Sequence, residues 1–327
     1  MPPGMKGYTQ NRGMILLVQG QPTVGKTTVV GQLLDATEHS TGLPFELRVA
    51  DIDGKLDPLL VGWDGKPRSA EQLSRVWHVP VSEDLSLSKD TGFAMPEGAP
   101  LGYEKLISLQ RRFGDFGPDA EKDDQYDDWQ MNRVLVYDDL TSFIELAIFH
   151  VLQNRAKGMR RKDGSLTNKA PSDYGAVQDL VWDYMKTWHK RATRRFHIIW
   201  TCHVDHISIN LNKRVDEEDL KNAYASQQAR AELEKKMGGD IGAAMMTLQS
   251  EKKYPLLFGK QLQEKFMSKF HVCWVERDPH RGPIVGTEPS VLYDARMPRG
   301  LPTTLSGKTA LADIFNHYAK LNEELPE

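Results

Sequence analysis

GQPTVGKT, the stretch from Gly20 to Thr27, matches the phosphate-binding loop pattern G-x-x-x-x-G-K-[ST] at every fixed position. The apolar run Met14 to Val18 precedes it and is typical of a buried parallel strand, and Thr28 to Leu34 follows with the pattern of a helix. Glycines let such a loop curl so that backbone N–H groups face phosphate oxygens, and the helix N-terminus adds partial positive charge. The order of strand, loop and helix therefore predicts a nucleoside triphosphate site.

Individual loop positions have distinct expected roles. Lys26 is expected to reach the β and γ phosphates of ATP, and Thr27 is expected to ligate Mg²⁺. The alternative, a chance glycine-rich turn followed by Lys-Thr, does not account for the flanking strand and helix. The residues expected to contact the nucleotide are Gly20, Gln21, Pro22, Thr23, Val24, Gly25, Lys26, Thr27 and Thr28.

Composition limits the classes of protein that this chain can belong to. Its 327 residues carry a formal net charge of -3, which excludes a surface coated in basic residues, so any nucleic-acid contact must come from local patches. Cys202 and Cys273 each lie in an apolar run and form no metal-type pair, which indicates buried thiols in a reducing compartment. No apolar run reaches about twenty residues and the first residues lack a signal-peptide core, so we expect a soluble, cytoplasmic protein with no membrane contact.

Apolar runs alternate with helical patterns along the chain. This alternation predicts an α/β fold with a mostly parallel central sheet flanked by helices. A C-terminal strand pair and a closing amphipathic helix are expected to complete it. The strands are expected at Glu46 to Asp53, Arg133 to Asp139, Phe196 to Thr201 and Phe270 to Glu276, with a candidate return strand at Val291 to Asp294, and the closing helix is expected at Ala310 to Leu321.

We interpret residues 1–327 as one domain. Residues 57–131 are expected to form an inserted surface elaboration, because Pro and Gly recur there and an acidic run covers its later part. Residues 204–245 are expected to form a long loop or helical segment. Residues 246–327 are expected to supply the C-terminal strands and the helix that complete the core.

Carboxylates follow two of the expected strands. Asp138 ends an apolar strand well downstream of the loop, where a carboxylate is needed to hold Mg²⁺ through water opposite Thr27. Asp138 and Asp139 would also suit the N-cap of the following helix, and the two roles are compatible. Hydrolysis further needs a group that activates water, and both Asp139 and Asp53 are candidates.

Two strand endings resemble those of RecA-like P-loop ATPases. DIDGKLDP, from Asp51 to Pro58, is similar to the D-A-E-H-A-L-D-P stretch of RecA recombinases, in which the glutamate activates water. That register gives the role to Asp53, whose side chain is one methylene shorter, and favours it over Asp139. The Thr201-Cys202-His203 ending resembles the position where such proteins place a Gln or His that senses the γ phosphate, which makes His203 the candidate sensor.

More narrowly, the chain resembles phage-encoded nucleotide-binding proteins related to single-strand annealing ATPases. The resemblance rests on the strand ending DDLTSF at Asp138 to Phe143 and on the late motif YDAR at Tyr293 to Arg296. It implies Mg²⁺-dependent ATP hydrolysis coupled to single-stranded DNA in recombination, repair or replication, with phage replication or recombination proteins as partners. It also implies a homo-oligomer in which a neighbour's cation completes the site, with Arg296 and Arg281 as candidates and Lys308 as a weaker one.

The same resemblance implies which segments face DNA. They are the basic loop Lys157 to Lys169 and the segment after His203, and the contacts are expected from Arg160, Arg161, Lys162, Lys213 and Arg214. Further positive charge at Lys186 to Arg195 is equally explained by a solvated helix C-terminus.

Two other functions stay open. A nucleotide-switched assembly protein would act through protein partners, and a steep salt dependence of single-strand binding would argue against it. A P-loop small-molecule kinase uses the same loop, but no Arg-rich lid sequence lies near it.

Overall fold

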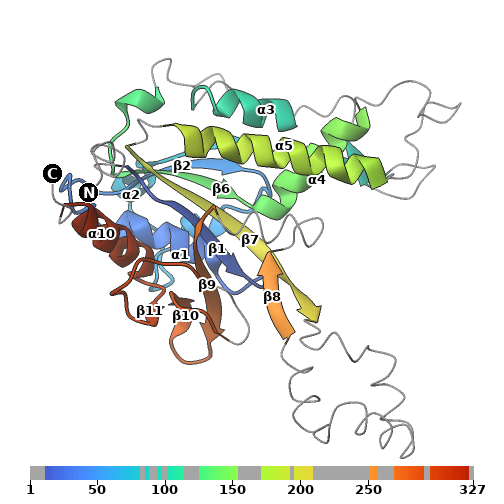
Figure 1. The fold of residues 1–327 in the computed structure, drawn as a ribbon. Helices are drawn as coiled ribbons and strands as arrows, with labels where there is room; N and C mark the ends of the chain where they lie inside the picture. Colours follow the sequence, from blue (N-terminus) through green and yellow to red (C-terminus); the bar gives the residue numbers. More distant parts are fainter. Residues whose placement is uncertain are drawn as a thin grey trace, which may run out of the picture.

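The computed structural model describes residues 12–81, 85–87, 94–96, 102–113, 125–153, 171–191, 195–208, 251–255, 269–290 and 295–323. Within this part of the chain a nine-stranded sheet has helices on both faces (Figure 1). The strand order is β11-β10-β9-β1-β7-β6-β2-β3, and β8 pairs with β7. The strands of this sheet are β1 Ile15–Gly20, β2 Glu46–Asp51, β3 Val76–Pro80, β6 Arg133–Asp138, β7 His197–Ser208, β8 Glu251–Pro255, β9 His271–Asp278, β10 Gly282–Gly286 and β11 Thr304–Ser306.

Helices and a small hairpin complete the inventory. A separate two-stranded sheet joins β4 Leu85–Leu87 to β5 Ala94–Pro96. The helices are α1 Lys26–Gly31, α2 Ala70–Leu73, α3 Gly102–Leu109, α4 Leu140–Gln153, α5 Pro171–Lys190 and α10 Ala310–Glu323, with short 3-10 turns at Gln32–Asp35, Asp57–Leu59 and Tyr126–Asp128. The expected α/β architecture with a mostly parallel, helix-flanked sheet is confirmed.

The parallel strands end together at one edge of the sheet. β1 pairs in parallel with β7 and β9, and β6 pairs in parallel with β7 and β2. In this register Gly20 lies opposite His203, and Asp51 lies opposite Asp138. β7 stands between β1 and β6, so its carboxyl end lies between the phosphate-loop strand and the strand that ends in Asp138.

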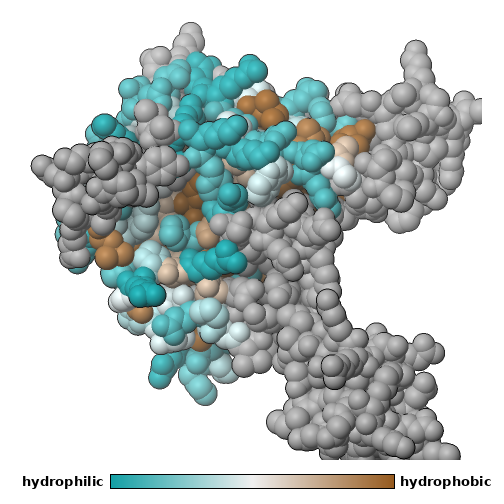
Figure 2. Space-filling view, in the orientation of Figure 1, coloured by the Kyte–Doolittle hydropathy of each residue, from teal (hydrophilic) through white to brown (hydrophobic). Residues whose placement is uncertain are grey.

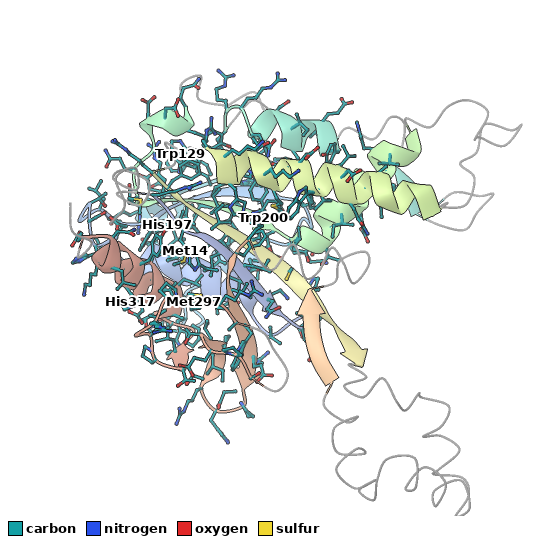
Figure 3. All side chains as sticks on the ribbon, in the orientation of Figure 1. Met14, Trp129, His197, Trp200, Met297 and His317 are labelled. Atoms are coloured by element: carbon teal, nitrogen blue, oxygen red, sulfur yellow. The ribbon has the colours of Figure 1, made fainter. Side chains whose placement is uncertain are left out.

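Period-two alternation along the strands divides the core into two layers. Leu17 faces the layer under α3, α4 and α5, which contains Trp129 and Trp200, whereas Leu16 faces the layer under α1 and α10. Figure 3 shows Trp129 and Trp200 on the α5 side and Met297 on the α10 side. Two covered faces explain why these strands are continuous apolar runs.

Residues 57–131, expected to be a surface elaboration, contribute more than surface. β3 extends the sheet as a parallel neighbour of β2. Leu106 of α3 is buried, and Tyr126 and Trp129 pack edge to face beneath the helical layer. The helical pattern from Tyr103 to Arg112 predicts α3, but β3 is an edge strand without apolar alternation, and Tyr126 and Trp129 are surrounded by carboxylates in the sequence, so these were not expected.

The return strand after β9 is β10, at Gly282–Gly286, earlier in the chain than the candidate return strand at Val291 to Asp294. Asp278 closes a tight turn by accepting backbone hydrogen bonds from His280 and Arg281, so the chain reverses earlier than the sequence indicated. The candidate return strand at 291–294 lies outside the described residues. The closing helix is confirmed as α10.

Polar residues lie mostly on the surface of the described chain, and the two thiols lie in its interior. Figure 2 shows a mostly hydrophilic described surface with small separate apolar groups on this face. None of the described helices combines the length and the apolar character that crossing a bilayer requires. Cys202 and Cys273 are buried, as expected, and burial raises the pKa of both thiols.

Candidate active site

The glycine loop joins β1 to α1 with the backbone that its sequence predicts. Gly25 precedes α1 with a φ of 98°, a left-handed conformation that glycine adopts without strain. A Cβ at Gly20 would lie 2.7 Å from the carbonyl oxygen of Val275, so only glycine fits beside β9. No side chain caps α1, and the first N–H groups of a helix have no intrahelical acceptor. The loop therefore presents backbone donors at the carboxyl edge of the sheet.

Lys26 lies over this loop and is buried. Its Nζ donates to the carbonyl oxygens of Gly20 at 3.0 Å and Gln21 at 2.9 Å, and lies 3.0 Å from Nδ1 of His203. Burial lowers the pKa of Lys26, while the nearby Asp139 and other negative groups act in the opposite direction. The ammonium group is thus held at the point where three strand ends meet.

Asp138, at the end of β6, contacts the loop directly. Its Oδ2 accepts a hydrogen bond from Oγ1 of Thr27 at 2.9 Å, and its Oδ1 accepts one from Thr201. Burial raises the pKa of Asp138, and the two threonine hydrogen bonds offset part of that effect. The pair that the sequence predicted to hold Mg²⁺, Thr27 and Asp138, is brought into contact.

The capping role belongs to Asp139 rather than to Asp138. Oδ1 of Asp139 accepts a hydrogen bond of 2.7 Å from the backbone N–H of Ser142, which is the N-cap geometry for α4. Burial alone would raise the pKa of Asp139, but the hydrogen bonds from His203 and from Ser142 outweigh it and hold that pKa below its usual value. Asp139 is therefore a buried carboxylate that stays charged.

His203 connects Lys26 with Asp139. Its Nε2 lies 2.9 Å from Oδ2 of Asp139, while Nδ1 faces the ammonium group of Lys26. A proton on Nε2 and a lone pair on Nδ1 satisfy both neighbours, and we assign this tautomer from the network. The expected sensor position thus contacts both the phosphate loop and the acidic strand end.

Asp53 reaches the same edge from β2 but is more open. Its backbone N–H donates to the carbonyl oxygen of Asp138 at 3.2 Å. Its side chain is 32% exposed, and Oδ2 lies 2.8 Å from Nζ of Lys55. The preceding Asp51 instead accepts the backbone N–H of Gly54 at 2.8 Å and shapes the exit turn.

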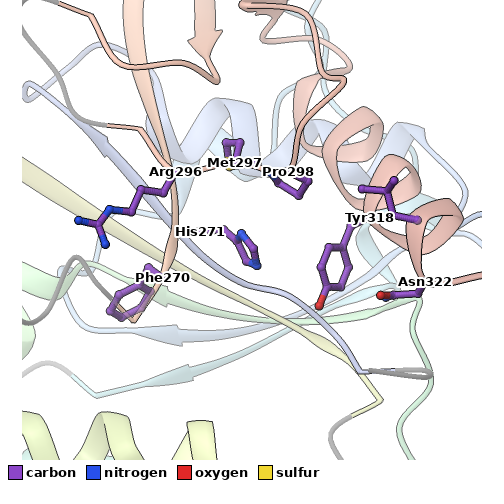
Figure 4. A pocket seen from close by; sticks show the side chains of 8 residues that line it. Phe270, His271, Arg296, Met297, Pro298, Tyr318 and Asn322 are labelled. Carbon is purple, nitrogen blue, oxygen red and sulfur yellow. The ribbon is translucent and has the colours of Figure 1, made fainter. Parts of the chain in front are cut away.

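The three candidate cations from the last part of the sequence lie at different places in the fold. Arg296 exchanges backbone hydrogen bonds with Val272 on the side of β9 that faces away from β1, so the structure does not bring it to Lys26 of the same chain. Figure 4 shows its side chain beside Phe270 and His271, at a pocket of about 610 Å³. Arg281 lies in the β9–β10 turn at the edge of the phosphate loop, where Pro283 lies against Gly25. Lys308 is exposed just before α10.

Other expected contacts lie outside the described part of the chain. These are the nucleic-acid residues Arg160, Arg161, Lys162, Lys213 and Arg214. Conversely, Thr201 was missed as a site residue although it donates to Asp138. A hydroxyl within the apolar run of β7 was the only signal for it.

No family model matches the sequence, and no curated protein matches it.

Proposed function

We propose that this chain is a Mg²⁺-dependent ATPase of the RecA-like P-loop type whose nucleotide state controls binding of single-stranded DNA, in phage-type recombination, repair or replication. The observation that carries the ATPase is one cluster: Lys26 and Thr27 from the loop meet Asp138 and His203 from two adjacent strand ends. Phosphoryl transfer offers a role for each of them: a cation for the phosphates, two oxygen ligands for Mg²⁺ and a polar group at the γ phosphate.

The cluster fits Mg·ATP by its donor set. The Thr27 hydroxyl and the Asp138 carboxylate are hard oxygen ligands, already within 2.9 Å of each other. Mg²⁺ bound there supplies neutralisation of charge on the β and γ phosphate oxygens. Lys26 would exchange two neutral carbonyl partners for charged phosphate oxygens, which form stronger hydrogen bonds.

Asp53 is the better candidate to activate water. A general base needs a carboxylate oxygen that water can reach. Both oxygens of Asp139 face partners within the protein, Ser142 and His203. Within the described residues the carboxylate of Asp53 pairs with the exposed Lys55, and such surface pairs are weak. Asp139 then orients His203, and Asp53 takes the proton from the attacking water.

Substitution of the two acids separates these roles. Asp53→Asn is expected to lower kcat by about 10²-fold or more with little effect on ATP affinity, because it removes the base alone. Asp139→Asn should lower kcat less than Asp53→Asn does, because Asn can keep the N-cap of α4 while its amide NH2 disturbs only the contact with His203. Single-turnover hydrolysis and binding of a fluorescent ATP analogue measure the two effects. The reverse ranking would assign the base to Asp139.

β7 offers a route from the nucleotide to DNA. It carries Thr201 and His203 at the site and continues to Ser208, paired with β8. Figure 1 shows this β7–β8 ribbon reaching beyond the neighbouring strands. A shift of His203 on loss of the γ phosphate would be passed along one strand toward the segment that holds Lys213 and Arg214.

Hydrolysis measured with and without single-stranded DNA, at low and moderate salt, tests the coupling. Stimulation that falls steeply with salt is expected, because phosphate contacts release counterions. Hydrolysis that DNA leaves unchanged would favour a nucleotide-switched assembly protein over the DNA role.

A further inference from the structure

A second cationic surface lies at the opposite edge of the sheet from Lys26. Arg12 lies just before β1, Lys269 lies just before β9, and the last turns of α5 precede β7. β1, β7 and β9 are parallel neighbours, so their starts lie together at the edge away from the phosphate loop. A pocket of about 610 Å³ opens there, lined by Arg12, Trp182, Met185, Lys186, His189, Lys190 and Lys269, and we refer to it as the α5 pocket.

Positive charge dominates the α5 pocket. Lys186 pairs with Asp183 at 3.2 Å, and Arg12 donates a hydrogen bond to the carbonyl oxygen of His189 in the last turn of α5. Lys190 and Lys269 are both exposed, and within the described ranges neither has a carboxylate within ion-pair distance. Cations near a helix C-terminus are favoured by the helix dipole, which accounts for Lys186 and Lys190. The dipole of α5 does not account for Arg12 and Lys269, because these residues belong to the segments before β1 and β9.

Trp182 adds an aromatic surface to this charge. It is half-buried, whereas Tyr184, Met185 and Trp188 of the same helix are buried in the core. The ammonium groups of Lys186 and Lys269 lie 5.5 Å and 5.9 Å from its ring centroid. Two cations and one indole ring therefore lie together in the α5 pocket, which combines positive charge with a planar aromatic surface.

We propose that the α5 pocket binds single-stranded nucleic acid, with Trp182 stacking on an unpaired base and with Lys190 and Lys269 contacting the flanking phosphates. Cationic grooves with aromatic stacking surfaces are the chemistry that such binding uses. The proposal rests on the proposed single-strand binding and deepens it. It adds contact residues to those expected at Arg160 and Lys213, and it places them at the edge of the sheet away from the phosphate loop.

Three charge reversals with equal change in net charge test the phosphate contacts. Anisotropy of a fluorescein-labelled oligo-dT reports binding to the full chain. Lys190→Glu and Lys269→Glu are each expected to weaken binding about tenfold and to flatten the slope of log affinity against log salt by about 0.7 per lost contact. Lys320→Glu is the matched control, because Lys320 is likewise exposed in the last turn of a helix, and its affinity should stay within about twofold.

Aromatic substitution tests stacking. Trp182→Leu should weaken oligo-dT binding by about five- to 150-fold, and Trp182→Phe should retain most of it, because loss of one base stack has that range of effect. Mg²⁺-dependent ATP hydrolysis without DNA should be unchanged in all of these variants, which shows that they fold.

The contrary outcomes are distinct. If the wild type binds oligo-dT and both Lys190→Glu and Lys269→Glu behave like Lys320→Glu, the strand binds elsewhere and this proposal is overturned while the DNA function stands. If the wild type shows no salt-dependent binding, the pocket assignment and the DNA role both fall, and the ATPase is unaffected. If free dTMP competes as well as the oligonucleotide per phosphate, a mononucleotide replaces the strand as the ligand.

Discussion

Lys26→Ala is expected to lower ATP hydrolysis by at least about 10²-fold, because removal of one preorganised donor to developing phosphate charge typically costs about 10²–10³ in kcat. Lys26 is also buried against two loop carbonyls and His203, so the alanine leaves a site without its central cation. Steady-state phosphate release at saturating Mg²⁺ measures the effect.

The control for this variant is Lys66→Ala, because Lys66 is an exposed lysine whose partner is the surface carboxylate of Asp64. It should hydrolyse ATP at the wild-type rate. Lys26→Ala that retained more than about a tenth of the activity would exclude the loop as the hydrolysis site. Lys26→Ala is expected to lose both basal and DNA-stimulated hydrolysis, because the same site performs both.

Asp138→Asn is expected to abolish Mg²⁺-dependent hydrolysis, with a loss of about 10²–10³ in kcat. The asparagine keeps the shape of the side chain and can still accept from Thr27, but it lacks the negative charge that attracts the cation. The Mg²⁺ concentration for half-maximal activity should rise at least about tenfold. Titration of the metal at fixed ATP measures it, and Asp128→Asn, at an exposed acid, is the control.

The same substitution should not destabilise the protein without metal. Burial raises the pKa of Asp138, so in the interval between its ordinary and raised pKa the folded state binds more protons than the unfolded state. Stability therefore falls as pH rises through that interval, and at neutral pH the buried charge costs free energy. Asp138→Asn removes this cost, and thermal unfolding without Mg²⁺ should occur at an equal temperature or about 2 °C higher. A large fall in the unfolding temperature would mean that the hydrogen bonds from Thr27 and Thr201 contribute more free energy than the buried charge costs.

The opposite shifts of Asp138 and Asp139 follow from their partners. Within the described residues the carboxylate of Asp138 accepts from two hydroxyls, whereas that of Asp139 accepts from a backbone N–H and faces the ring of His203. Two adjacent carboxylates thereby divide their roles. In the proposed function Asp138 serves the cation, and Asp139 positions His203 beside Lys26.

Local sequence patterns were sufficient to predict the buried strands in the interior of the sheet. The apolar runs at 14–18 and 134–137 predicted strands, as did the stretch 46–51, which ends in a carboxylate, and the structure confirms all three as interior strands of the sheet. The edge strand β3 was not predicted, because only a neighbour on one side fixes its register and its side chains are largely exposed. The return strand was misplaced because the decisive signal is the tight turn closed by Asp278, not hydrophobicity.

The sequence by itself determined the loop and the residues that a phosphate and a cation need, since G-x-x-x-x-G-K-[ST] constrains the backbone through glycine and the chemistry through Lys26 and Thr27. It offered Asp138 and His203 as candidates, but it did not determine that they contact the loop, or which of Asp53 and Asp139 lies beside His203. Tertiary structure decided that, because the strand order placed β7 between β1 and β6 and so brought His203 between Lys26 and Asp139. The α5 pocket was likewise decided by the fold, since Arg12 and Lys269 reach Trp182 only when the starts of distant parallel strands lie side by side.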